Sequence, residues 1–164
     1  RAHAIIIARW FPQVAYYGAT YVSLVDNGAI SEGEVFDVIV PTGNFGNILA
    51  GYFAKKMGIP IGKLICASNQ NKVLADFFET GVYDMNRDFY TTSSPSMDIL
   101  LSSNFERFLF YVAKEDAAKV AQWEKDLLET GKMSVSADEL KALRQEFEGG
   151  WIDDDETKAV INHV

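Results

Sequence analysis

A periodic pattern of apolar residues covers the first 25 positions of the chain. These side chains recur at spacings of three, four and seven residues: Ile7, Trp10, Phe11, Val14, Tyr21 and Val25. The periodicity predicts an amphipathic helix, with Gly18 on the same face where a close neighbour could pack. A stripe of aromatic residues along this helix is expected to lie mostly in the core: Trp10, Phe11, Tyr16 and Tyr17. The run Asp26-Asn27-Gly28 is typical of a helix stop.

Short apolar runs then alternate with helical patterns. We predict buried strands over residues 36–40 and 63–67, and helices over residues 48–57 and 71–79. Pro41 ends the first strand, and Gly58 and Gly81 follow the two helices as C-terminal stops. The order strand, helix, strand, helix with short connections indicates an α/β protein with a parallel βαβα unit and right-handed crossovers.

The pattern changes after Tyr83. Residues 86–96 are polar and read as a loop, and Ser103 with Glu106 predicts a capping box in front of a helix over residues 105–112. Three further helical stretches are predicted over residues 116–129, 136–147 and 155–163, the second opened by a capping-box pair, Ser136 with Glu139. We therefore divide the chain into an α/β part, residues 1–112, and a helical region, residues 113–164.

Composition adds constraints on the class of protein. The 164 residues are 48% hydrophobic and 23% charged, which is typical of a soluble folded chain, and none of the apolar runs approaches the roughly 20 residues of a membrane helix. The net charge is −8, and from Lys114 onward seven Lys and Arg face thirteen Asp and Glu. An acidic chain without a basic cluster is a poor candidate for binding nucleic acid or anionic lipid. A single cysteine, Cys66, leaves no disulfide framework and fits a reducing, cytoplasmic compartment.

The turn between the first predicted strand and helix, residues 41–47, is the strongest candidate for chemistry. Gly43 and Gly46 would let the backbone adopt positive φ and approach an anion closely, and the helix that follows would direct its free N–H groups at that anion. The turn lacks the Gly-Lys-Ser/Thr of a Walker A loop and the third glycine of a dinucleotide fingerprint. By shape alone, its glycines could equally serve packing in a tight turn.

The residues around this turn closely resemble threonine synthases, which use pyridoxal phosphate and have the tryptophan-synthase-like (type II) fold. The matching segments run from residue 9 to about residue 111: RWFPQVAYY (9–17), VPTGNFGNILAGY (40–52), AKKMG (54–58), LICASNQN (64–71), FETGVY (78–83), SPSMDI (94–99) and SSNFER (102–107). The acidic helical remainder is compatible but less distinctive.

The resemblance implies an enzyme of threonine biosynthesis, a pyridoxal-phosphate-dependent lyase. Its small-molecule substrate would be O-phospho-L-homoserine, which it converts with water to L-threonine and phosphate. In that family the glycine-asparagine loop holds the cofactor phosphate, and the corresponding residues are Gly43, Asn44, Phe45, Gly46 and Asn47. Thr42, beside them, is a weaker candidate.

One departure from the family concerns catalysis. The family forms its internal Schiff base through a lysine beside a Phe and before an Asp, upstream of the phosphate loop, and this chain has none there. Lys55 and Lys56 lie about nine residues beyond the loop, roughly 13 Å along a helix, and are read as a solvated helix end. We therefore expect an internal fragment of a threonine synthase that is inactive alone and that could self-associate through the face left uncovered.

Two other functions remain open. Another type II lyase, such as a dehydratase, usually carries a run of glycines where this chain has Asn-Phe-Gly-Asn. A non-catalytic phosphate-binding or scaffold domain would explain why the lysine is missing, but simple truncation of an enzyme would explain it equally well.

Four other sequence features give weaker indications of function. The acidic run 153–156 lacks the ligand pattern of a calcium loop and reads as a helix start, and His3 and His163 have no partner at ligand spacing, so we predict no metal site. Cys66 is expected to be a core residue rather than a nucleophile. The segment 94–98 either faces the substrate or is a plain loop, and this choice stays open for its four residues of interest: Ser94, Ser96, Met97 and Asp98.

Overall fold

The structure, a computed structural model, describes residues 10–163. The helices are α1 (Trp10–Asp26), α2 (Gly46–Lys56), α3 (Val73–Thr80), α4 (Phe105–Val112), α5 (Ala117–Thr130), α6 (Ala137–Glu146) and α7 (Asp154–His163), with a 3-10 turn, η3, over Pro95–Met97. The strands are β1 (Phe36–Pro41), β2 (Ile61–Ser68), β3 (Val82–Asp84), β4 (Lys132–Ser134) and β5 (Phe147–Trp151). Every predicted strand and helix within the described residues is present, with ends shifted by a few residues.

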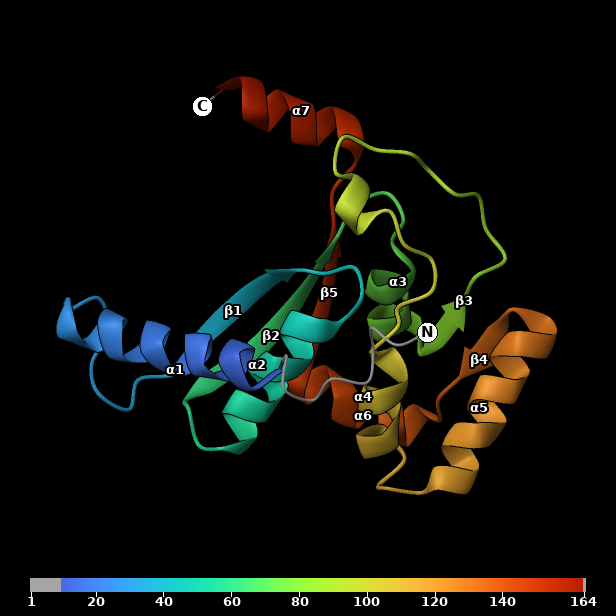
Figure 1. The fold of residues 1–164 in the computed structure, drawn as a ribbon, viewed down its shortest axis with the longest axis horizontal. Coiled ribbons are helices and arrows are strands. Elements are labelled where there is room, and N and C mark those ends of the chain that lie inside the picture. Colours follow the sequence, from blue (N-terminus) through green and yellow to red (C-terminus); the bar gives the residue numbers. More distant parts are fainter. Residues whose placement is uncertain (1–9, 164) are drawn as a thin grey trace.

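A parallel sheet with the order β1-β2-β5 organises the molecule (Figure 1). In register, Cys66 of β2 lies between Val40 of β1 and Gly149 of β5, and one row away Ile65 lies between Ile39 and Glu148. The first row faces the buried core and the second row faces away from it. The parallel α/β arrangement predicted from the sequence is therefore confirmed.

Strand β1 differs from its prediction as a buried strand. It lies at the edge of the sheet, and Ile39 on its outer face is 67% exposed. Within β1 only Val40 is fully buried. A β-branched run is compatible with either environment, because the sequence pattern alone does not say whether a second layer covers the sheet.

Strand β5 and the small two-stranded antiparallel sheet of β3 and β4 lie where no strand was predicted. β5 comes from the predicted helical region and pairs with β2, although two of its residues are glycines. Gly149 is required for packing, because a Cβ there would lie 2.6 Å from the backbone oxygen of Ala75 in α3. The division of the chain at residue 112 stays a prediction. Strand β5 comes from the part after this division, but it pairs with β2 from the part before it.

An aromatic core lies between the sheet and helices α2, α3 and α4. Its rings come from distant parts of the sequence, and the centroids of four of them lie 5.2 to 6.2 Å from that of Phe45: Phe78, Phe105, Phe108 and Phe147. Because one of these rings, Phe45, belongs to the predicted phosphate loop, the core fixes the position of that loop.

Helix α1 packs on α2 through a close contact. A Cβ at Gly51 would lie 2.8 Å from the ring of Tyr17, so glycine is needed at that crossing. The predicted aromatic stripe is only partly correct, because Tyr17 is buried whereas Phe11 and Tyr16 are 69% and 61% exposed. Ile7 and the side chain of Trp10 lie outside the described part of the chain.

Three further helices occupy the predicted helical region, α5 to α7. The predicted capping box at Ser136 and Glu139 is confirmed, since both reciprocal hydrogen bonds are present. Helix α7 projects away from the sheet and buries none of its described residues (Figure 1). Among the helices that the structure describes, none is long and apolar enough to cross a bilayer.

Candidate functional site

The predicted phosphate loop lies at the carboxyl edge of the sheet, between the end of β1 and the start of α2 (Figure 1). Thr42 continues the β1–β2 ladder by donating its N–H to the carbonyl of Ala67 at 2.8 Å. Its hydroxyl donates to the carbonyl of Val40 at 2.6 Å and is buried. Thr42 therefore fixes the start of the loop, and its hydroxyl is engaged within the protein.

Backbone N–H groups are the chemically distinctive feature of the loop. The N–H groups from Gly43 to Asn47 have no hydrogen-bond acceptor among residues 10–163. They precede or open the 11-residue helix α2, which has no acidic residue in its first turn. Unpaired N–H groups and the positive end of a helix dipole together favour an anion at this position.

Phe45 gives the loop its shape. Its φ of 61° and ψ of 11° place it in the left-handed region, which is uncommon for a residue with a Cβ. Its side chain is 1% exposed, and its ring centroid lies 5.3 Å from that of Phe105 and 5.2 Å from that of Phe108. Burial of the ring thus stabilises a backbone conformation that the residue would otherwise avoid.

The two loop glycines have a different role from the predicted one. Neither Gly43 nor Gly46 has a positive φ, so the expectation of left-handed glycines is wrong. A Cβ at Gly43 would lie 2.9 Å from Cδ1 of Ile99 and 3.2 Å from the carbonyl oxygen of Ser96. Glycine is needed at position 43 because another loop packs directly against it. At Gly46 the corresponding contact, to Nδ2 of Asn104, is an ordinary 3.5 Å.

Residues 102–104 contact the loop from the side of α4. Ser102 donates its hydroxyl to the carbonyl of Gly43 at 2.9 Å, and Asn104 donates its side-chain amide to the carbonyl of Asn44 at 2.8 Å. Ser103 donates its hydroxyl to the side-chain oxygen of Asn44 at 3.1 Å. The predicted capping box at Ser103 and Glu106 is therefore wrong: Asn104 is the N-cap residue, and the Ser103 hydroxyl serves Asn44 instead of the helix.

A second polar network lies at the carboxyl end of β2 and settles part of the open question about residues 94–98. The carboxylate of Asp98 accepts hydrogen bonds from the side-chain amides of Asn69 (2.7 Å) and Asn71 (3.2 Å). It also accepts from the backbone N–H (2.9 Å) and hydroxyl (2.7 Å) of Thr92. Burial raises the pKa of Asp98, but these hydrogen bonds outweigh it and hold the pKa below its usual range. Asp98 thus acts as an anchor for its loop.

The other residues of interest in this loop, Ser94, Ser96 and Met97, make different contacts. The backbone of Ser96 and the sulfur of Met97 lie against Gly43, at 3.2 and 3.5 Å from the position of a Cβ there. Ser94 donates its N–H to the hydroxyl of Thr92 at 3.1 Å. A role for Ser94 and Ser96 toward a substrate stays a prediction.

Helix α1 supplies a further contact to the start of α2. The hydroxyl of Tyr17 lies 2.8 Å from Oδ1 of Asn47 and 3.1 Å from its carbonyl oxygen. Asn47 also donates its side-chain amide to Gln13 at 3.2 Å. Burial raises the pKa of Tyr17 to about 12, so the hydroxyl keeps its proton as a donor at neutral pH.

Cys66 is the one cysteine of the chain and lies under the loop. It is fully buried, and burial raises the pKa of its thiol to about 12, while the hydroxyls of Thr42 and Ser68 lower it slightly. A thiol with this pKa is protonated at neutral pH and is a poor nucleophile. The prediction that Cys66 is a core residue is confirmed.

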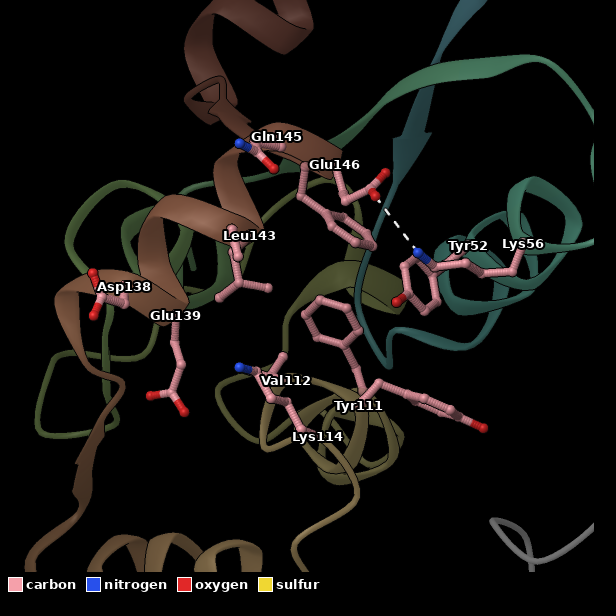
Figure 2. Close-up of a pocket in the computed structure, with 13 residues that line it drawn as sticks. Tyr52, Lys56, Tyr111, Val112, Lys114, Asp138, Glu139, Leu143, Gln145 and Glu146 are labelled. Carbon is pink, nitrogen blue, oxygen red and sulfur yellow. Dashed lines mark ion pairs between the residues drawn. The ribbon is translucent and has the colours of Figure 1, made fainter.

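A pocket of about 300 Å³ lies elsewhere, between α2, α4 and α6 (Figure 2). Lys56 and Glu146 face each other across it, with 3.6 Å between Nζ and Oε1. Lys55 also pairs with Glu146, donates to the carbonyl of Gly62 and is only 23% exposed, so its reading as a solvated helix end is wrong. The charges of Lys55, Lys56 and Glu146 are thus paired with one another at this pocket.

The remaining candidates are structural. Asp153 accepts a hydrogen bond from the N–H of Glu156 at 2.7 Å, which confirms the acidic run as a helix start. Residues 10–163 contain no group of three or more His, Cys, Asp and Glu side chains arranged for a metal ion. His163 is exposed, and His3 lies outside the described residues.

Several residues of this site were not singled out from the sequence. Ser102, Asn104, Asn69 and Asn71 were noted only as parts of the family-like segments, and the role of Tyr17 depends on the crossing of α1 and α2. One available signal was position: polar side chains that follow the ends of neighbouring parallel strands gather at one edge of a sheet. This rule points to Asn69 and Asn71, whereas Ser102 and Asn104 reach the loop only through tertiary packing.

Comparisons with known proteins place this geometry in context. The chain is 46% identical over 162 residues to human threonine synthase-like 1, covering 98% of this chain and 22% of that protein. It is 39% identical over 166 residues to threonine synthase of Saccharomyces cerevisiae, covering 96% of this chain and 32% of that enzyme. The chain thus spans less than a third of the length of these two curated relatives. No protein-family model matches the chain.

Solved structures give the same result for the fold. The crystal structure of threonine synthase from Brucella melitensis with bound pyridoxal phosphate superposes with a TM-score of 0.88 and 45% identity. The match covers 97% of this chain and 33% of that one. The resemblance seen in the sequence motifs and the expected type II fold are therefore confirmed.

Proposed function

We propose that the loop Gly43–Asn47 binds the phosphate group of pyridoxal phosphate. The premise is that this chain is a homologue of the threonine synthases along nearly its whole length. The observation that carries the proposal is the row of backbone N–H groups that have no acceptor within residues 10–163 and that lead into the start of α2. A phosphate carries the charge and the acceptor oxygens that such a row requires.

The residues present fit a phosphate group. Gly43 has no side chain to obstruct the loop, Phe45 is anchored in the aromatic core, and the first turn of α2 has no carboxylate that would repel an anion. Met97 and Ile99 lie against Gly43 and provide an apolar wall beside the loop. These residues bind and orient the phosphate end and limit the access of water to it.

The reaction we propose for the protein that contains this chain is the conversion of O-phospho-L-homoserine and water to L-threonine and phosphate. When bound, pyridoxal phosphate supplies an electron sink for carbanion chemistry on an amino acid. This chain contributes the phosphate cradle, and we propose that the lysine that carries the cofactor lies in the part of the relatives' length that the chain does not span. Lys55 and Lys56 are unsuited to that role, because they end α2 opposite the loop and pair with Glu146.

We expect the chain alone to bind phosphate but not to catalyse the reaction. The small-molecule substrate, the cytoplasmic location and self-association of the isolated chain also remain predictions. Ile39 on the open face of β1 supports the last of these, because an exposed apolar sheet face favours association.

An amide NMR titration tests the binding step. The 164-residue chain is titrated with inorganic phosphate, with pyridoxal phosphate and with pyridoxal, which lacks the phosphate group. We expect shifts in the amide signals of residues 43–48 with both phosphate compounds, larger for pyridoxal phosphate, and none of comparable size with pyridoxal. Absence of such shifts at millimolar pyridoxal phosphate would refute binding by this chain.

The reaction itself is tested on the longer protein. Release of inorganic phosphate and formation of threonine from O-phosphohomoserine are measured with and without added pyridoxal phosphate. Turnover that depends on the cofactor supports the proposed enzyme. Cofactor binding without turnover of this substrate would instead favour a non-catalytic domain or a different lyase.

A further inference from the structure

We propose that Ser102 and Asn104 are positioning residues of the phosphate site, which hold the loop's carbonyl groups away from the anion and thereby turn its N–H groups toward it. The inference rests on the proposed function, because it assumes that the loop binds phosphate. It concerns two residues from the start of α4, more than 50 positions further along the chain than the loop.

The argument begins with the geometry of the peptide bond. In a planar trans peptide, the C=O of one residue and the N–H of the next point in opposite directions. Ser102 donates its hydroxyl to the carbonyl of Gly43 at 2.9 Å, which fixes the direction of the Asn44 N–H. Asn104 donates its side-chain amide to the carbonyl of Asn44 at 2.8 Å and its backbone N–H at 3.2 Å, which fixes the direction of the Phe45 N–H.

These contacts explain why, within the part of the chain that the structure describes, the loop carbonyls have donors while the loop N–H groups have no acceptors. A carbonyl turned toward the anion would repel it and would remove a donor from the cradle. Rotation of the peptide between residues 43 and 44 is the conformational change that glycine permits most readily. Loss of the Ser102 hydroxyl would leave the Gly43 carbonyl without this donor in a buried place, where an unpaired group is costly.

Both positioning residues are themselves held in place. The backbone N–H of Ser102 donates to the hydroxyl of Tyr83 at 3.0 Å, and Tyr83 donates to the carbonyl of Leu100 at 2.9 Å. Arg107 donates to the side-chain oxygen of Asn104 at 2.9 Å, which leaves the amide nitrogen of Asn104 to face the loop. The orientation of each donor is therefore set by a second contact and does not depend on a ligand.

Ser103, between the two, provides a natural control. Its hydroxyl contacts the side-chain oxygen of Asn44 and not a loop carbonyl. A serine-to-alanine change at position 103 therefore matches the change at position 102 in chemistry and in sequence context, but leaves the peptide orientation of the loop untouched.

The test measures dissociation constants for inorganic phosphate, pyridoxal phosphate and pyridoxal by amide NMR, using the full 164-residue chain and three variants. For Ser102→Ala and Asn104→Leu we expect phosphate and pyridoxal phosphate to bind roughly fivefold more weakly or worse, the affinity equivalent of one net hydrogen bond. Asn104→Leu has a similar volume and adds no charge that would itself repel phosphate, but its side chain cannot donate to the carbonyl of Asn44. Ser103→Ala should bind within twofold of the unaltered chain.

The pattern across ligands separates positioning from general damage to the fold. A merely structural change would alter the thermal midpoint and the affinities for all three ligands together, whereas loss of positioning affects only the ligands that carry phosphate. The amide signals of Asn44 and Phe45 should also move in the ligand-free variants. If Ser102→Ala does not fold, the comparison of Asn104→Leu with Ser103→Ala decides the question.

Two negative results would be distinguishable. Equal phosphate affinities in all three variants and the unaltered chain would overturn the positioning role while leaving the proposed function intact. Failure of the unaltered chain to bind phosphate would overturn the proposed function, and this inference with it, before any variant is considered.

Discussion

Two turns at the same edge of the sheet have the same topology and different uses. The first, residues 42–45, joins β1 to α2, and the second, residues 69–72, joins the neighbouring parallel strand β2 to α3. Each therefore ends at the N-terminus of a helix, where free N–H groups are expected. In the first, the N–H groups from Gly43 to Asn47 have no acceptor within the described residues, whereas in the second the N–H of Asn71 already donates to Oδ1 of Asn69.

The second turn uses its polar groups inside the protein. The N–H of Asn71 donates to Oδ1 of Asn69 at 2.9 Å, and both amide side chains donate to Asp98. Asn71 also makes two hydrogen bonds with the backbone of Tyr90. Its Oδ1 accepts from the N–H of Tyr90 at 2.9 Å, and its side-chain amide donates to the carbonyl of Tyr90 at 2.8 Å. The result is an anchor for the loop over residues 90–98.

The helices that follow the two turns also differ in the charge of their first turns. Helix α3 has Asp76 in its first turn, whereas α2 has no acidic residue there. A carboxylate near the N-terminus already interacts with the helix dipole and repels a second anion. The comparison teaches that free N–H groups at a helix N-terminus do not by themselves make an anion site: the first turn of the helix must also lack a carboxylate, and the polar groups of the preceding turn must not already be engaged within the protein.

The largest expected effect comes from Phe45, which shapes the first turn. We expect Phe45→Ala to lower the free energy of unfolding by about 3–5 kcal/mol, because a fully buried aromatic side chain is removed from the core. Phe89→Ala is the control, since Phe89 is exposed and should change stability by less than about 0.5 kcal/mol. Both are measured by urea denaturation.

A second variant at the same position tests the backbone argument. Phe45→Gly removes the same ring but allows the left-handed conformation without a steric penalty, which is about 1–2 kcal/mol for other residues. We therefore expect Phe45→Gly to be at least as stable as Phe45→Ala. A markedly less stable glycine variant would show that the left-handed conformation does not matter here.

The next effect concerns the glycines of the first turn. Gly43→Ala places a Cβ against Ile99 and Ser96 and should cost about 1–3 kcal/mol as overpacking. Gly46→Ala has room, and alanine favours a helix, so its stability should be unchanged or higher by up to about 1 kcal/mol. Equal losses at both positions, again in urea denaturation, would contradict the packing reason for Gly43.

These positions also show how far the sequence could go. The spacing of glycines between a β-branched run and a helix located the loop correctly, because turn chemistry is local. The reason assigned to the glycines was wrong, because the need for Gly43 arises from Ile99, more than 50 residues away. The left-handed residue proved to be Phe45, which has no local signal for that conformation.

Local patterns failed where tertiary partners compete. Among the described residues, the Ser136 hydroxyl contacts only Glu139 and forms the capping box, whereas the Ser103 hydroxyl bonds to Asn44 instead of forming the predicted box. Strand β5 was not predicted because its two glycines weaken the strand pattern. Its stability depends on pairing with β2 and on the close approach of Ala75.

A smaller effect is expected at the second turn. Asp98→Asn replaces a carboxylate that accepts several hydrogen bonds by an amide with one acceptor oxygen, and should cost about 1–2 kcal/mol. Because the pKa of Asp98 is lowered in the folded state, its contribution is fully present above the unfolded pKa of about 3.9 and is lost as the pH falls through the folded pKa. The variant should therefore lose stability less steeply in acid.

The measurement for Asp98 is a series of urea denaturation curves between neutral and acidic pH. Asp88→Asn is the matched control, an exposed residue of the same polar segment. If the Asp98 variant followed the unaltered chain at every pH, the carboxylate would not be the anchor of the loop.

The smallest effect is expected at the contact between α1 and the first turn. Tyr17→Phe removes the hydroxyl that contacts Asn47 but keeps the ring on Gly51, so we expect a loss of about 0.5–1.5 kcal/mol and a shifted amide signal at Asn47. Since burial raises the pKa of Tyr17 to about 12, its contribution is present below the unfolded pKa of about 10 and lost as the pH rises toward 12. Tyr16→Phe, at an exposed position of the same helix, should leave stability and the Asn47 signal unchanged. Equal behaviour of the two variants would mean that α1 does not help to set the start of α2, and that the loop is held by α4 and the aromatic core alone.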